Sequence, residues 1–185
     1  MDEQGYGKII DLGFAKVVTD KTFTLCGTPE MLAPELIMSK GHDHAVDYWA
    51  FGVVVYELLV GHSPFYIRGS SQIDMFKRIV LVKYEIPAFV NESAKTMIQQ
   101  LLVRKQSKRL GNLANGYLDI KQYPWFKESD ISFKQIIRRE ADAPWKPELK
   151  DPFDASNFDD MIAFEKERDV GRRLTREEQV IFKGF

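Results

Sequence analysis

Most of the side chains that could carry out chemistry lie in the first 35 residues. Asp11 begins a D-L-G turn. An aspartate in such a turn either shapes the turn or offers carboxylate oxygens to a hard cation such as Mg²⁺. Residues 19–34, which include Thr24, are polar and contain Gly and Pro. This composition predicts a long loop, and long loops in compact domains usually serve a function.

A glycine-rich phosphate loop is not present before this turn. Gly5 and Gly7 begin a G-x-G-x-x-G pattern, but Ile10 stands in place of the third glycine. The apolar runs at residues 8–10 and 14–18 instead predict two short strands that flank the turn. We therefore expect a small β-hairpin at the start of the chain.

The elements behind these residues are predicted to be mainly helical. Residues 44–60 are apolar on nearly every face and end at Gly61, which predicts a central core helix. Further helices are predicted at 71–83 and 91–103, with Asn91 as N-cap of the latter. Their predicted core stripes are Ile73, Phe76, Ile79 and Val80, and Ala94, Ile98, Leu101 and Leu102.

Glu57 is a carboxylate within the otherwise apolar helix predicted at 44–60. A carboxylate in such a helix needs a partner or a route to water. The sequence leaves both a core position and a binding role open.

Composition limits the class of protein. The chain has 185 residues, a formal net charge of −1 and a single cysteine, Cys26. This charge gives no indication of nucleic-acid or membrane binding, and one cysteine suits a reducing compartment. The longest apolar stretch, residues 53–60, is too short to span a bilayer. We expect a soluble protein of the cytoplasm, with the nucleus as an alternative.

Several phrases occur in a fixed order along the whole chain. They are DLGFAK at 11–16, TLCGTPE at 24–30, LAPE at 32–35, AVDYW at 45–49, KRLGN at 108–112, SNFDD at 156–160 and the terminal FKGF. D-x-G and A-P-E bound the activation segment of protein kinases. The chain resembles the AGC family of serine/threonine kinases, in particular its cyclic AMP-dependent branch.

The resemblance implies a Mg²⁺- and ATP-dependent enzyme that phosphorylates serine or threonine. Asp11 matches the family's metal-binding aspartate, and Phe158 matches the tail aromatic that completes the adenine pocket. Leu12 departs from the usual phenylalanine of D-F-G.

Regulation is implied in the same way. Thr24 matches the activating phosphothreonine, with Thr22 as an alternative site and Lys16 as a phosphate partner. A phosphate can order a loop by pairing with basic side chains. Thr28 resembles the threonine that contacts the catalytic aspartate and the substrate.

Substrate recognition follows from three further matches. Leu25 and Leu32 resemble residues that bind an apolar residue after the target Ser or Thr, and Glu57 resembles a carboxylate that binds a substrate arginine. The implied substrates are proteins with Arg or Lys upstream of the target. Met31 replaces an aromatic residue beside this pocket.

Four residues match structural positions of the family. Glu35 and Arg109 resemble the ion pair that ties the activation segment to the lower helices, with Trp49 nearby. Asp47 resembles the helix aspartate that holds the catalytic loop.

The resemblance predicts two regions, a partial kinase domain at 1–126 and an AGC tail at 127–185. The sequence contains no H-R-D catalytic loop and no glycine-rich loop or V-A-I-K lysine before Asp11. The expected fold is therefore a kinase C-terminal lobe without the N-terminal lobe, on which Phe182 and Phe185 of the tail would otherwise dock.

Two hypotheses about function follow. In the first, the chain is the C-terminal part of a kinase that is truncated here and inactive alone, without bound ATP or Mg²⁺. In the second, it is a non-catalytic module that binds kinase substrates or a cyclic-nucleotide-binding regulatory subunit.

Overall fold

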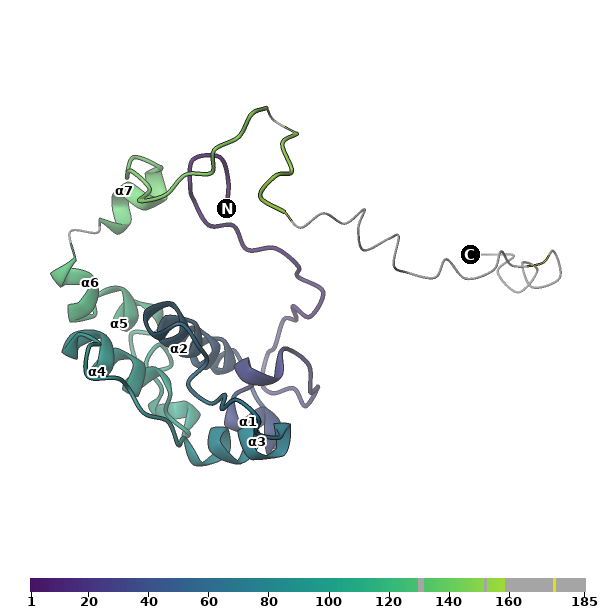
Figure 1. Cartoon of the computed structure of the whole chain (residues 1–185). Helices are drawn as coiled ribbons and strands as arrows, with labels where there is room; N and C mark the ends of the chain where they lie inside the picture. The colour runs from purple at the N-terminus through teal and green to yellow at the C-terminus, as the bar shows by residue number, and fades with distance from the viewer. Residues whose placement is uncertain (130–131, 152, 159–174, 176–185) are drawn as a thin grey trace. The chain divides into compact units, whose positions relative to one another are not determined.

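A computed structural model describes residues 1–129, 132–151, 153–158 and 175 (Figure 1). The chain divides into two units, residues 10–141 and residues 1–9 with 142–185. We call the first the helical unit. The predictions for Phe182 and Phe185 lie outside the described residues.

The described part of the helical unit is built of short helices around one longer one. In chain order these are η1 (Pro29–Met31), α1 (Pro34–Ile37), α2 (Ala45–Val60), α3 (Gln72–Leu81), α4 (Glu92–Leu101), η2 (Gln106–Lys108), α5 (Tyr117–Lys121), α6 (Pro124–Glu128) and α7 (Phe133–Arg138). None of the described helices is long and apolar enough to cross a membrane. The mainly helical fold expected from the sequence is confirmed.

The central helix α2 matches the prediction for residues 44–60 closely. It ends at Gly61, whose φ of +91° is a left-handed conformation that glycine adopts readily. Its buried residues, among them Trp49 and Val53, form a stripe on one side. Leu58 is 81% exposed, so the apolar residues of α2 are covered on one side only within the described structure.

The caps of α3 and α4 explain where these helices begin. The Ser71 hydroxyl accepts a hydrogen bond from the Asp74 amide at 3.2 Å, and the Asn91 side chain accepts one from the Ser93 amide at 2.7 Å. The Asn91 cap is confirmed, as is the burial of all four predicted core residues of α4. The core stripe predicted for α3 is wrong in part, because Ile73 is exposed and Met75 is buried beside Ile79.

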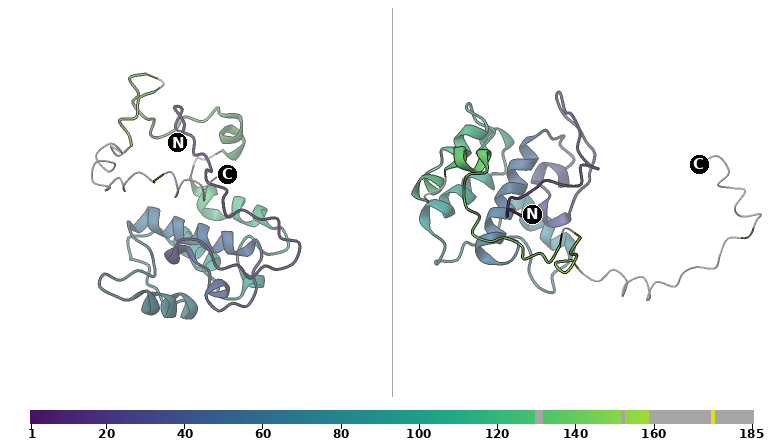
Figure 2. Two further views of the ribbon diagram at one scale, coloured as in Figure 1. Left: turned by 90° about the vertical axis from the view of Figure 1, so that its right-hand side faces the viewer. Right: turned by 90° about the horizontal axis from the view of Figure 1, so that it is seen from above.

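Helix α2 packs on α4 and η1, α1 packs on α3, and α4 packs on α6 (Figures 1 and 2). The contact between α2 and α4 is close because residue 52 is a glycine. A Cβ added there would lie 2.8 Å from the Leu101 Cβ and 3.0 Å from the Leu102 Cδ2. Gly52 therefore sets the distance between the two helices.

We predict that Gly52→Ala destabilises the protein by about 1–2 kcal/mol. Overpacking of a filled core typically costs about 1–3 kcal/mol, and the better helix propensity of alanine offsets up to about 1 kcal/mol. Urea denaturation measures the difference. Val54→Ala on the exposed side of α2 is the control, with an expected change within about 0.5 kcal/mol. A stabilised Gly52→Ala variant would contradict the close helix contact.

The hairpin predicted around the D-L-G turn is not confirmed. The turn is present, with a hydrogen bond of 2.9 Å from the Ala15 amide to the Leu12 carbonyl. Residues 8–10 and 14–18 do not pair as strands, and Ile9 and Val17 are almost fully exposed. A lone two-stranded hairpin with nothing packed on its apolar face is marginal at best. The described bridge lies elsewhere, between Thr22 and His42.

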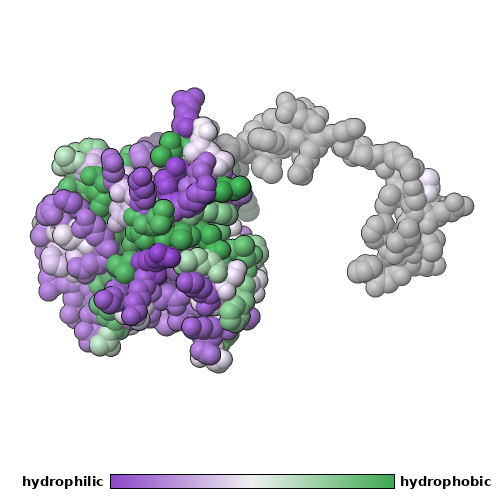
Figure 3. Space-filling view, turned by 90° about the horizontal axis from the view of Figure 1, so that it is seen from below, coloured by the Kyte–Doolittle hydropathy of each residue, from purple (hydrophilic) through white to green (hydrophobic). Residues whose placement is uncertain are grey.

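The surface of the described structure carries apolar areas. Seen from below, hydrophobic residues form a continuous area bordered by hydrophilic ones (Figure 3). Phe14, Phe23 and Leu58 are among the large apolar side chains that are mostly exposed. Apolar areas of this kind commonly mark surfaces that another chain or segment covers.

In the second unit, the first residues form a compact turn. The Tyr6 amide donates a hydrogen bond of 2.9 Å to the Asp2 carboxylate. Gly5 has a φ of +83°, and a Cβ there would collide with the Trp145 carbonyl oxygen. Glycine is thus required where residues 1–9 meet residues 143–146.

Candidate functional site

Asp11 lies in an exposed turn of the helical unit. It adopts a φ of +60°, a conformation that aspartate tolerates better than most residues. Its Oδ1 accepts a hydrogen bond of 3.2 Å from the Gly13 amide. The described residues contain no group of three or more His, Cys, Asp or Glu placed to hold a metal. Asp11 can thus supply one carboxylate to Mg²⁺, which proteins often bind with one or two carboxylates plus substrate phosphates.

The segment after this turn runs extended and is fixed by its bridge to the loop before α2. The Thr22 amide donates to the His42 carbonyl, and the His42 amide donates to the Thr22 carbonyl, each at 2.9 Å. Side chains alternate along an extended segment. Thr22, Thr24 and Cys26 accordingly line one cavity, while Phe23 and Leu25 are exposed.

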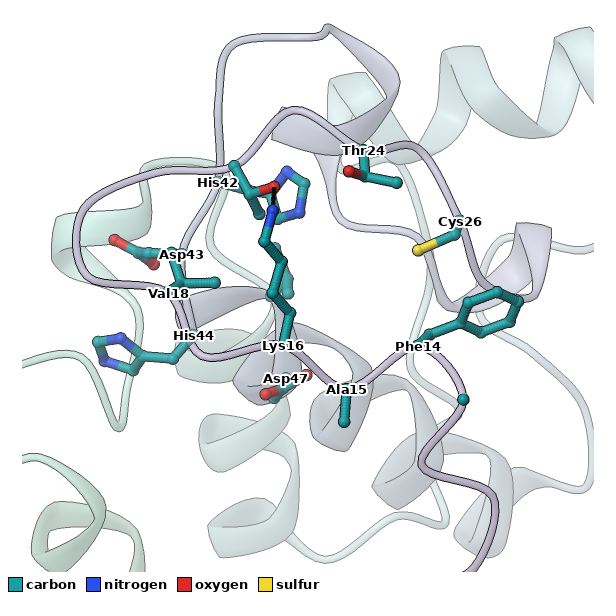
Figure 4. Close-up of a pocket in the computed structure, with 13 residues that line it drawn as sticks. Phe14, Ala15, Lys16, Val18, Thr24, Cys26, His42, Asp43, His44 and Asp47 are labelled. Carbon is teal, nitrogen blue, oxygen red and sulfur yellow. Dashed lines mark hydrogen bonds between the residues drawn. The ribbon is translucent and has the colours of Figure 1, made fainter.

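We call this cavity of about 440 Å³ the Lys16 pocket. Its polar lining includes Lys16, Thr22, Thr24, His42, Asp43 and Asp47 (Figure 4). The Lys16 ammonium donates a hydrogen bond of 3.0 Å to the Thr22 hydroxyl. Of the site residues predicted from the sequence, Lys16, Thr24 and Asp47 line this pocket, and Asp11 lies two residues outside its lining.

Thr22 and Thr24 differ in their surroundings. Thr22 is buried and its hydroxyl is bonded to Lys16, whereas Thr24 is exposed. A modifying enzyme can reach Thr24 without breaking the Thr22–His42 bridge.

The residues predicted to recognise substrate are spread over several elements. Leu25 is exposed, Leu32 is buried in the core, and Thr28 precedes η1 on the surface. Glu57 is half-buried near the end of α2, and Met31 packs partly against the core. The described structure does not gather Leu25 and Leu32 in one pocket.

Glu35 and Arg109 form a buried ion pair. Arg109 Nη1 lies 2.7 Å from Glu35 Oε1, and Nη2 lies 3.0 Å from Oε2, which is the paired geometry of two parallel hydrogen bonds. Arg109 also donates to the carbonyls of Ala45 and Val103. Its guanidinium carbon lies 5.2 Å from the centroid of the Trp49 ring. The A-P-E segment is thereby tied to α2 and to the loop after α4.

Phe158 lies in the second unit and is largely exposed, while Asp47 is exposed in the first turn of α2. The sequence reasoning missed two features of the site. His42 lines the Lys16 pocket although it sits in a loop, and the carbonyl acceptors of Arg109 are backbone atoms. No periodic pattern marks either feature.

Comparison with known proteins gives independent evidence of the family of this chain. Residues 1–126 match the protein kinase domain family. The chain is 44% identical over 159 residues to the "cAMP-dependent protein kinase catalytic subunit" of Dictyostelium discoideum, which covers 86% of this chain and 24% of that protein. It is 39% identical to the "cAMP-dependent protein kinase catalytic subunit 2" of Drosophila melanogaster, covering 87% of this chain and 45% of that one.

A third relative matches along the full chain. The "cAMP-dependent protein kinase catalytic subunit PRKX" of Mus musculus is 38% identical over 185 residues, which are 100% of this chain and 50% of that protein. The chain thus spans between about a quarter and a half of the length of these relatives.

Proposed function

Because the chain belongs to the protein kinase family, in the AGC group that includes the cyclic AMP-dependent kinases, we propose that it supplies the activation segment and C-terminal lobe of a serine/threonine protein kinase. The enzyme transfers the γ-phosphoryl group of ATP to serine or threonine hydroxyls of proteins. The Lys16 pocket supports the proposal, since its lining includes both Lys16 and Thr24.

Within this function, Asp11 supplies a carboxylate oxygen to Mg²⁺. The Mg²⁺–ATP complex provides the phosphoryl group and the charge that neutralises its oxygens. The turn bond from the Gly13 amide fixes one oxygen of Asp11, and the other oxygen makes no hydrogen bond within the described part of the chain. Phe158, from the tail, is proposed to contact the adenine.

Substrate selection is proposed to rest on the activation segment and α2. Glu57 binds an upstream arginine, because a half-buried carboxylate favours a bidentate guanidinium partner. The exposed Leu25 offers an apolar contact to the residue after the target, and Thr28 lies beside the target itself. The proposed substrates are proteins with Arg or Lys before the phosphorylated residue.

Thr24 is proposed as the phosphorylated residue of the segment, with Lys16 as a phosphate partner. A phosphate adds nearly two negative charges and three acceptor oxygens. Lys16 is already held at the pocket by Thr22, so a phosphate on Thr24 meets an ammonium without a large rearrangement.

We also propose that the 185-residue chain does not transfer phosphate by itself. Its sequence contains none of the H-R-D loop, the V-A-I-K lysine or the glycine-rich loop. A non-catalytic role in binding a substrate or a regulatory subunit is the second candidate, favoured by exposed apolar residues such as Leu58 on α2. The cytoplasm or nucleus is the proposed location.

A chimera tests the catalytic proposal. We join the part of the Dictyostelium relative that precedes its match to Asp11 to residues 11–185 of this chain. We expect Mg²⁺-dependent phosphorylation of a serine peptide with upstream arginines, and a fall of about 100-fold or more in Asp11→Asn, because transition-state charge is left unneutralised. The isolated chain should give no turnover.

Two outcomes would count against the proposal. An inactive chimera that nevertheless melts cooperatively would argue for the binding role. Equal activity of the Asp11→Asn chimera would remove Asp11 from the metal site, and Asp20→Asn, on the exposed loop, is the control that should retain full activity.

A further inference from the structure

His42 is a buried histidine whose ring has no assigned role. The residue is only 9% exposed, and the bridge to Thr22 fixes its backbone through two hydrogen bonds of 2.9 Å. Within the described part of the chain, its ring nitrogens make no hydrogen bond, although the ring lines the Lys16 pocket. A ring nitrogen that borders a cavity without a hydrogen bond can donate to an acceptor that enters the cavity.

The same pocket contains the hydroxyl that would carry a phosphate. Thr22 and Thr24 lie on one side of the extended segment, and Thr22 holds the Lys16 ammonium at 3.0 Å. In Figure 4 the Thr24 hydroxyl points toward the space where the His42 ring and the end of Lys16 lie. An acceptor placed on Thr24 would therefore meet two nitrogen donors.

We propose that His42 is a second cationic partner, with Lys16, of a phosphate on Thr24, and that it makes the protection of this phosphate dependent on pH. This inference rests on the proposed phosphorylation of Thr24. Imidazole gains its charge between about pH 8 and pH 5, and the second ionisation of a phosphate monoester lies near pH 6. Near neutral pH the two groups can form a charge-assisted hydrogen bond.

The charge of the His42 ring matters for phosphate binding because of the other charged and titratable groups around it. They are Lys16 and Cys26 on the activation segment, Asp43 and His44 in the loop before α2, and Asp47 on α2. With both histidines neutral, one ammonium faces two carboxylates and an incoming dianion. A protonated His42 adds a second positive charge, which strengthens the hold on the phosphate.

Two neighbouring side chains, Asp43 and His44, are already engaged in other contacts. The Asp43 Oδ1 accepts a hydrogen bond of 2.8 Å from the Ala45 amide, so this carboxylate is already engaged at the N-terminus of α2. The exposed His44 packs edge-on against Tyr48, with 6.0 Å between ring centroids. His42 is the histidine held rigidly beside the phosphorylated segment.

The test uses the full 185-residue chain with phosphothreonine incorporated at position 24 during translation. A nonspecific phosphatase acts on it at pH 6 and at pH 8, and each rate is divided by the rate for a free phosphopeptide of residues 19–29. This ratio removes the pH dependence of the phosphatase and of the phosphate itself. We expect the ratio to rise at least about fivefold from pH 6 to pH 8.

Substitutions of His42 show whether this residue causes the pH dependence. His42→Gln should give a high ratio at both pH values, and His42→Lys, with a fixed charge, should keep the ratio low at both. His62→Gln is the matched control, since His62 lies outside the pocket and its Nδ1 contacts the Ser63 carbonyl oxygen at 3.0 Å. Circular dichroism and urea denaturation establish that each variant is folded, and His42→Lys keeps the test decisive if His42→Gln does not fold.

The outcomes separate this inference from the proposed function. If Lys16→Gln loses protection while His42→Gln keeps the parent's pH dependence, the phosphate is bound at Thr24 and the inference about His42 is wrong. If neither variant differs from the parent in the protection of the phosphate, neither Lys16 nor His42 binds it, and the proposals for both residues are wrong. A pH dependence that disappears in His44→Gln alone would move the role to His44 and overturn the assignment to His42.

Discussion

Arg109→Met should destabilise the protein by about 3–5 kcal/mol, because it leaves the Glu35 carboxylate buried without its partner. All five N–H donors of Arg109 are used: two bind Glu35, one binds the Ala45 carbonyl and two bind the Val103 carbonyl. The Arg109 side chain is fully buried, and that of Glu35 is 4% exposed. Methionine fills the volume but supplies none of these donors.

A loss of this size is large compared with the total free energy of unfolding, which is about 5–15 kcal/mol for typical domains. Urea denaturation followed by circular dichroism gives the difference. Arg109→Lys should recover only part of it, since an ammonium cannot reproduce the two parallel hydrogen bonds of the guanidinium. This conservative variant also serves as the measurement if Arg109→Met does not fold.

A double-mutant cycle shows whether the pair itself is responsible. Glu35→Met alone leaves a buried guanidinium unpaired, whereas Glu35→Met with Arg109→Met removes both charges. Replacing both partners of a buried pair is often far less destabilising than removing one. We expect the double variant to be more stable than the sum of the single losses predicts by at least about 1–2 kcal/mol. Additive losses would contradict a coupled pair.

Local signals in the sequence were sufficient for the helices and their ends. The oxygen of Asn91 and the left-handed conformation of Gly61 act within one turn, so their effect depends little on the rest of the fold. The apolar stripe of α4 was likewise correct, since Ala94, Ile98 and Leu101 are buried. Such features are decided by residues close together in sequence.

Predictions that depend on a partner segment fared less well. The runs at 8–10 and 14–18 have the composition of strands, but strand pairing needs a cross-strand neighbour and a covered face, and neither forms. Ile73 follows the periodicity of α3, yet it lies in the first turn of that helix and is exposed. Periodicity identifies a possible face without saying what covers it.

In the candidate site, too, the residues could be identified from the sequence, but their arrangement depends on packing between distant segments. The residues of the Glu35–Arg109 pair were identified by resemblance, while their distances depend on how α1, α2 and the loop after α4 pack. The position of His42 depends on a bridge between two loops 20 residues apart, which composition does not encode. The roles proposed for Asp11, Thr24 and Glu57 rest on the family and on the experiments described above.

Two substitutions of the core residue Trp49 should differ strongly in how much they destabilise the protein. Trp49 is fully buried, stacks on Phe65 at 5.5 Å between ring centroids, and lies under the Arg109 guanidinium. Trp49→Ala should destabilise the protein by about 3–5 kcal/mol, since it removes these contacts and leaves a cavity. It also removes the ring that supports Arg109.

Trp49→Phe should cost less than half as much, for a specific reason. The indole Nε1 of Trp49 is buried and has no hydrogen-bond acceptor among the described residues. An unsatisfied buried donor costs about 1–3 kcal/mol, and phenylalanine removes that donor while keeping a ring for Phe65 and Arg109. The relief of the donor therefore offsets much of the lost volume.

Trp125→Phe is the matched control, because Trp125 contacts the Phe126 ring in a tilted arrangement, with 5.1 Å between ring centroids, and its Nε1 is not a buried donor without a partner. In that variant the lost volume has no compensating relief. Urea denaturation of the three variants should therefore place Trp49→Phe close to Trp125→Phe, even though Trp49 is the more deeply buried residue. If Trp49→Phe is as destabilised as Trp49→Ala, the Nε1 has an acceptor in solution, and its burial does not lower the stability of the parent protein.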